Sequence, residues 1–121
     1  WSAGRHMRQL GVIVSVSYGT DLVNAKNILQ GIMDNNEKVL KRPAPYVYAK
    51  QFGQYSIDFE LQFWAAQHEY WNELKGEIIT SIDKTFKAEG IEIPVPRQDL
   101  LIRPFDGKEI VITGDQAKTG Q

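Results

Sequence analysis

The chain contains no cysteine and only two histidines among its 121 residues. No disulfide can form, and neither a cysteine nucleophile nor a cysteine-based zinc site is available. The two histidines, His6 and His68, also lack the four-residue spacing of a helical zinc site. The absence of cysteine fits a protein of a reducing compartment.

Long hydrophobic runs are missing as well. No stretch reaches the ~18 to 20 consecutive apolar residues that cross a bilayer. The densest run lies around Gly11 to Val14 and is interrupted by Ser15 and Ser17. The N-terminus lacks the apolar middle segment of a secretory signal. We therefore expect a soluble chain whose residues 1–8 are either a linker from an upstream domain or a remnant of cloning.

An excess of charge of one sign is the third absence. Fourteen Lys and Arg residues stand against fifteen Asp and Glu, which gives a net charge of −1. A nucleic-acid-binding domain is normally strongly basic, so no nucleic-acid partner is expected. The hydrophobic fraction of 42% and charged fraction of 24% are typical of a folded globular domain, and the length suits a single one.

The first half of the chain shows a strand followed by a helix. Residues 10–18 alternate between apolar and small or polar side chains, which predicts a half-buried strand. Gly19 ends this strand, and Thr20 is expected to cap the helix that follows. Asn35 and Asn36 should end the helix, because Asn tolerates the left-handed conformation. The apolar stripe of this helix comprises Leu22, Ala25, Ile28, Leu29, Ile32 and Met33.

The second half predicts a hairpin, a longer helix and a short strand. Residues 46–52 and 55–64 are rich in β-forming residues, and Gly53-Gln54 between them suits a tight turn. A helix is expected over residues 65–88, with Gly90 as its stop signal. The prolines within residues 91–96 confine the last strand to an edge of the sheet.

This order of elements predicts an α+β fold of the ferredoxin-like βαββαβ type. We expect a two-layer sandwich in which a four-stranded antiparallel sheet carries two helices on one face. Right-handed crossovers place the first and third strands at the centre. The domain should span residues 9–96. Residues 97–121 then form a C-terminal extension with one further strand and a flexible tail.

The sequence offers few residues for chemistry. Asp58 and Glu60 point to the same sheet face, but the alternation of a half-buried strand by itself puts polar residues there. His68 is best explained as an exposed side chain at the start of the second helix. The loop with Lys38 and Lys41 is best explained as a solvated basic loop. We therefore predict no catalytic, cofactor-binding or metal-binding residue and no enzyme activity.

Aromatic residues gather where the hairpin meets the second helix. The helical phase of Trp71 places it toward the core. Trp64 lies at a strand end and is harder to bury. Because aromatic residues are concentrated at the centres of interfaces, Trp64 is a candidate for a protein contact.

Several ordered blocks resemble one known family. They are Val-Ser-Val-Ser-Tyr-Gly-Thr-Asp-Leu at residues 14–22, Phe-Glu-Leu-Gln-Phe-Trp at 59–64, Tyr-Trp at 70–71, and Gly-Ile-Glu-Ile-Pro-Val-Pro-Arg-Gln-Asp at 90–99. In order and spacing they resemble the C-terminal cytoplasmic domain of small-conductance mechanosensitive channels, the MscS family. The likeness covers about residues 8–102, so the tail from Phe105 to Gln121 receives no role.

The resemblance implies a part of a channel at the cytoplasmic face of the bacterial inner membrane. In such channels this domain joins its copies in a heptameric cage, below a β domain and a pore supplied upstream in the same chain. Contact with the membrane would occur only through that missing pore region. The segment after the prolines gives one strand per subunit to a barrel at the base of the cage, and it has no expected sheet partner in its own domain. Here that strand comprises Asp99, Leu100, Leu101, Ile102 and Arg103.

The expected function is therefore that of a non-catalytic cage domain of a tension-gated channel, which mediates assembly and forms or filters the vestibule. No cofactor is implied. The alternative is a regulatory module that binds a small ligand, suggested by the fold and by the tyrosines of the second strand. An acylphosphatase-like enzyme would need an Arg in the loop after the first strand, where this chain has Asp21.

Overall fold

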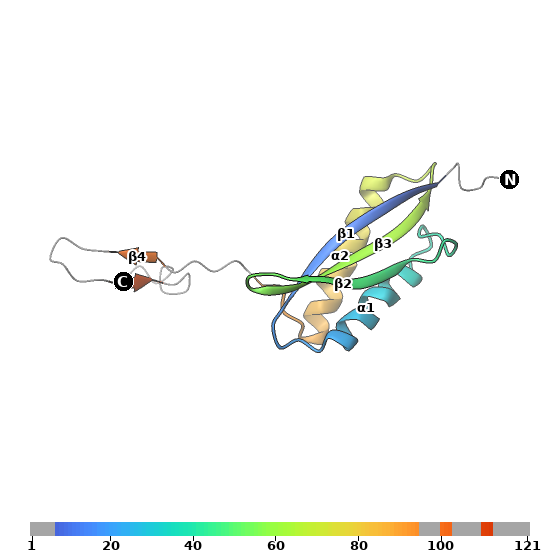
Figure 1. Ribbon diagram of the computed structural model, residues 1–121. Coiled ribbons are helices and arrows are strands. Elements are labelled where there is room, and N and C mark those ends of the chain that lie inside the picture. The colour runs from blue at the N-terminus through green and yellow to red at the C-terminus, as the bar shows by residue number, and fades with distance from the viewer. Residues whose placement is uncertain (1–6, 95–99, 103–109, 113–121) are drawn as a thin grey trace.

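The computed structural model describes residues 7–94, 100–102 and 110–112. The elements in chain order are β1 (Met7–Ser17), α1 (Leu22–Asp34), β2 (Tyr46–Phe52), β3 (Ser56–Ala66), α2 (Trp71–Glu89), β4 (Leu100–Ile102) and β5 (Ile110–Ile112). The two helices lie together on one face of the sheet formed by β1, β2 and β3 (Figure 1). The predicted α+β class and its helix-covered sheet are confirmed.

The sheet is antiparallel with the strand order β1-β3-β2. Leu61 at its centre pairs with Val12 on one side and with Val47 on the other. All three are buried, because side chains of one parity face the helices along each strand. The predicted alternation of β1 is confirmed. In β3 the buried series runs from Ile57 through Ala65, whereas Tyr55 is largely exposed.

The core lies between the sheet and the helices. α1 packs against β2 and β3, and α2 packs against β1. The predicted stripe of α1 supplies Ala25, Leu29 and Met33, and one face of α2 supplies Leu74, Ile78, Ile82 and Phe86, all of them buried. A sheet with one apolar face is thereby covered on that face only.

The helix ends follow the expected chemistry, with two differences. Asp21, one residue after the predicted cap, accepts a hydrogen bond from the backbone N of Asn24. The Thr20 hydroxyl donates instead to the carbonyl of Ser17. Asn35 ends α1 with φ of −93°, so it is not left-handed. Gly90 ends α2 with φ of +71°, as predicted.

The start of α2 and the position of the turn between β2 and β3 differ from expectation. The second helix begins at Trp71 rather than at residue 65, because β3 continues through Ala65, which also bridges to Val39. The hairpin turn also lies one residue later. Gly53 N donates to the carbonyl of Ser56 at 2.6 Å, and Gly53 has no positive φ.

The fourth strand of the expected sheet is not confirmed. The sheet has three strands, and residues 91–94 lie outside any strand. Ser17 N does donate to the Glu92 carbonyl at 3.1 Å, which is the first bond of such a strand. If the chain continued antiparallel to β1 after Glu92, the backbone groups of residues 94 and 96 would point toward β1, as those of Glu92 do. Both are prolines and have no N–H to donate, so the ladder cannot extend.

At the C-terminal end, Leu100–Ile102 forms a strand as expected, but it has a partner. β4 pairs antiparallel with β5, with Leu100 opposite Ile112. Among the described residues, β4 pairs with no strand of the β1-β3-β2 sheet, as expected, and its partner β5 lies in the same C-terminal extension. Asp99, Arg103 and residues 1–6 of the expected linker lie outside the described residues, whereas Met7 and Arg8 at the end of that linker belong to β1. In the part of the chain that is described, no helix has the length and apolarity needed to cross a membrane.

Candidate functional site

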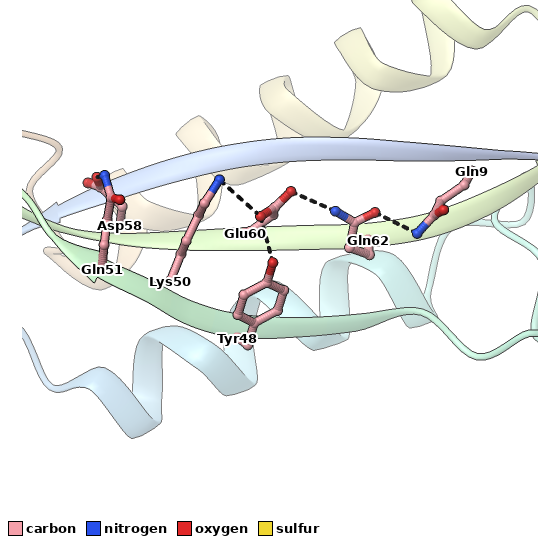
Figure 2. Close-up of polar contacts among 7 residues, drawn as sticks. All are labelled: Gln9, Tyr48, Lys50, Gln51, Asp58, Glu60 and Gln62. Atoms are coloured by element: carbon pink, nitrogen blue, oxygen red, sulfur yellow. Dashed lines mark hydrogen bonds and ion pairs between the residues drawn. The ribbon is translucent and has the colours of Figure 1, made fainter.

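The sheet face that the helices leave uncovered is the candidate site, which we call the open face. Alternate residues of three strands form it, and Figure 2 shows part of them. They are Gln9, Gly11, Ile13 and Ser15 of β1, Tyr46, Tyr48 and Lys50 of β2, and Ser56, Asp58, Glu60, Gln62 and Trp64 of β3.

Glu60 stands at the middle of this face and is held from both sides. The Tyr48 hydroxyl donates to Oε1 at 2.6 Å, and Lys50 Nζ lies 3.3 Å from the same oxygen. Gln62 Nε2 donates to Oε2 at 2.6 Å, while Gln9 Nε2 donates to the Gln62 amide oxygen at 2.9 Å (Figure 2). The network therefore links all three strands across the open face.

Asp58 is held in the same way nearer the hairpin. The hydroxyls of Ser15 and Ser56 both donate to Oδ1 at 2.7 Å. Gln51 Nε2 donates to Oδ2 at 3.1 Å. Both oxygens of each carboxylate on the open face thus accept at least one hydrogen bond from the chain itself.

These donors shift the protonation equilibria. Hydrogen bonds from Ser15, Ser56 and Gln51 lower the pKa of Asp58. The hydrogen bond from Tyr48 is the main cause of the lowered pKa of Glu60. The same bond raises the pKa of the Tyr48 hydroxyl. Both carboxylates are therefore ionised at neutral pH, whereas a general acid would have a raised pKa. The described residues also contain no group of three His, Cys, Asp or Glu side chains arranged to hold a metal.

Aromatic rings cluster at one end of the open face. The Tyr46 ring stacks near Tyr48, with centroids 6.0 Å apart, and lies 6.2 Å from the Trp64 ring. Trp64 is half-buried. The sequence marked Trp64 alone as an interface candidate and did not join it to Tyr46. Their proximity follows from the pairing of Tyr46 with Gln62, a register that the sequence does not specify.

Trp71 and His68 have the positions expected of structural residues. Trp71 packs partly buried against the core, and its Nε1 donates to the Ala66 carbonyl at 3.3 Å. The Arg8 guanidinium lies 4.3 Å above its ring, at cation–π distance. His68 is exposed, but it lies in the turn before α2 rather than within the helix.

The basic loop before β2 contacts both helices through exposed lysines. Lys38 Nζ lies 2.5 Å from Glu77 of α2, and this hydrogen bond raises the pKa of Lys38 and lowers that of Glu77. Lys41 donates to the carbonyl of Asp34. Val39 between them is buried, so the loop closes one end of the core.

The fold and its site define a class of protein: a two-layer α+β domain whose uncovered sheet face carries two carboxylates that accept hydrogen bonds from the chain itself. The family follows from comparison with known proteins. The family model described as mechanosensitive ion channel MscS, C-terminal, matches residues 10–93. The chain belongs to the MscS family of mechanosensitive channels.

Relatives and solved structures agree with this assignment. An uncharacterized MscS family protein of Synechocystis is 30% identical over 110 residues, which is 90% of this chain and 36% of that protein. The closed-state crystal structure of Helicobacter pylori MscS is similar with a TM-score of 0.74 and 25% identity, over 85% of this chain and 41% of that one. The Arabidopsis thaliana MSL1 structure, 14% identical with a TM-score of 0.65, shares the fold over 75% of this chain and 35% of that one. This chain spans about a third of the length of the curated relatives it matches.

Proposed function

We propose that the chain is a non-catalytic cytoplasmic domain of a tension-gated channel, and that it works by joining copies of itself into a cage. The observation that carries this proposal is the family match over residues 10–93, the part that folds into the sandwich. The pore and a β domain would come from other parts of the full-length protein. Its place would be the cytoplasmic face of the bacterial inner membrane.

We also propose the finer topology, a ferredoxin-like arrangement, with residues 91–94 in the place of the fourth strand. The bond from Ser17 N to the Glu92 carbonyl supports this position beside β1. The prolines keep this segment to a single bond in place of a full ladder.

The contacts between copies are proposed to involve two parts of the chain. The segment Asp99, Leu100, Leu101, Ile102 and Arg103 would contribute a strand to a barrel made with other copies. Its extended centre, β4, supports this, and closing a ring of strands would remove exposed edges. Trp64, with the neighbouring Tyr46, would anchor a second contact on the open face.

The cage would also filter solutes by charge. Asp58 and Glu60 remain ionised on the open face because their pKa values are lowered. Rings of charged side chains around openings bias which ions enter a vestibule. Copies of these carboxylates near an opening would favour cations over anions.

The test of assembly is the mass of the full-length protein purified in detergent, measured by light scattering with correction for the detergent. We expect seven copies per particle. A matched protein without residues 97–121 should form a less stable particle, because the proposed barrel strand is removed. A full-length protein that remains a single copy would contradict the proposal.

The ligand-binding alternative depends on Tyr46 and Tyr48. Their rings stack against each other on the exposed surface, and a groove between α1 and α2 lies elsewhere. Calorimetric titration with amino acids and nucleotides distinguishes this function. Saturable heat that disappears in Tyr48→Ala would favour it over a cage domain.

A further inference from the structure

The short sheet of β4 and β5 is held together within one chain. The residues of the two strands lie opposite each other, with Leu101 opposite Val111 at the centre (Figure 1). A strand has two hydrogen-bonding edges, and β5 occupies one edge of β4. In the part of the chain that the structure describes, the second edge of β4 pairs with no strand, because the two strands form a sheet of their own.

The pairing of β4 with β5 is short and apolar. Each strand has three residues, whereas about five to six are usual. A two-stranded hairpin on its own is only marginally stable in water. All the paired residues are Leu, Ile or Val, so burying them against further strands would be favourable. β4 can therefore exchange β5 for a partner that buries it better.

The barrel proposed above needs both edges of β4. In a closed ring with one strand per copy, every strand pairs with a neighbour on each side. Such a ring has no free edge, so no place is left for β5. The pairing of β4 with β5 and the ring of β4 strands are therefore mutually exclusive arrangements of the same strand.

A ring that kept both strands of each copy would be too wide. Seven copies would supply about fourteen strands, and the diameter of a barrel grows with the number of strands. The interior of a barrel of ~8 strands is filled by side chains, whereas ~16 strands leave a water-filled channel. Every position of β4 and β5 is aliphatic, so the wide ring would expose apolar residues to the water of that channel. One strand per copy is the favoured arrangement.

We propose that β5 covers one edge of β4 in the separate chain and leaves it when copies assemble. The edge that β5 covers is then the surface that accepts β4 of a neighbouring copy. This inference rests on the proposed cage and adds an order of events, because β4 must part from β5 before the ring can close. Until then β5 protects β4, since an open apolar strand edge invites pairing with the wrong chain.

The first test disrupts each strand separately in the full-length protein purified in detergent. Adjacent residues direct their N–H groups to opposite edges of a strand, so one of two adjacent prolines always removes a donor from the pairing. Light scattering measures the share of seven-copy particles at the concentration where half of the unchanged protein is dissociated. Ile110→Pro/Val111→Pro should raise this share above half, because the competing strand is removed. Leu100→Pro/Leu101→Pro should lower it, because the ring strand itself is broken.

The matched control is Ile110→Val/Val111→Ile, which exchanges the two residues and keeps β5 able to pair. It should leave the share of seven-copy particles at one half.

The second test uses the absence of cysteine from the chain. Leu101→Cys/Val111→Cys places two thiols at opposite positions, where the Cα separation suits a disulfide. In the 121-residue chain at low concentration, an oxidant should join them within one chain, as detected by mass spectrometry. In the seven-copy particle of the full-length protein, with any other cysteine replaced by serine, this intrachain disulfide should be lost.

The outcomes separate this inference from the cage on which it rests. An intrachain disulfide in the intact seven-copy particle, or its failure to form in the 121-residue chain, would overturn the inference and leave the cage in place. A share of particles in Ile110→Pro/Val111→Pro that stays at one half or falls would do the same. A full-length protein that remains a single copy would overturn the cage, and this inference with it.

Discussion

At the scale of single residues, Asp58 is the clearest example of what the sequence does and does not predict. Strand alternation placed it on the open face beside Glu60, and the structure confirms that position. Its donors Ser15 and Gln51 come from the two neighbouring strands. Those contacts depend on the register of β1 and on the bulge in β2, which no local pattern in the sequence encodes.

The network predicts a dependence of stability on pH. The pKa values of Asp58 and Glu60 are lower in the folded chain than in the unfolded chain, so both carboxylates stabilise the fold above their unfolded pKa of about 4. This stabilisation is lost as the pH falls through their folded pKa values. We expect the melting temperature to fall between about pH 5 and pH 2. In Asp58→Asn this fall should be smaller.

Ser15→Ala is the control for that measurement, because it keeps the carboxylate and removes the donor that lowers its pKa most. Ser15→Ala should also reduce the fall in melting temperature at acidic pH. Thermal unfolding followed by circular dichroism at several pH values measures both variants. If the melting temperature of Asp58→Asn fell with pH as steeply as that of the unchanged chain, the stabilising role of the Asp58 carboxylate would be contradicted.

At the scale of elements, glycines at two positions of α2 should respond in opposite directions. Gly90 ends the helix with φ of +71°, so Gly90→Ala should destabilise the fold by about 1 kcal/mol. Gly76 lies inside the helix with open space around its Cα, so Gly76→Ala should stabilise by about 0.5 to 1 kcal/mol. Urea unfolding of both variants measures the difference. If both substitutions changed the free energy of unfolding in the same direction, the assigned end of α2 would be contradicted.

The fourth strand gives another prediction at this scale. Pro94→Val restores an N–H at the position that faces the Ser15 carbonyl, two residues along from the bond between Ser17 and Glu92. The new amide should exchange with solvent more slowly than an exposed loop amide, as measured by NMR. Exchange as fast as in a loop would show that proline is not what stops the ladder.

The boundaries of elements were the least predictable part of the fold. Apolar periodicity identified both helices and all three strands of the sheet. The same analysis placed the start of the second helix at Ala65, directly after the predicted strand. Pairing with Arg8 and the bridge to Val39 keep Ala65 in β3 instead. Contacts between distant segments decided this boundary, and they outweigh local propensity.

At the scale of the whole molecule, the ordered blocks of sequence identified the family, and the match over residues 10–93 confirmed it. The same blocks did not reveal that Leu100–Ile102 pairs with Ile110–Ile112, because that second segment lies beyond the resemblance.

The central claim is that this domain serves a channel opened by membrane tension. Patch-clamp recording tests it most directly, using the full-length protein in membranes that lack other mechanosensitive channels. We predict current that appears when suction stretches the patch and disappears when the tension is released. Silence up to rupture of the patch, with the protein present in the membrane, would contradict the claim.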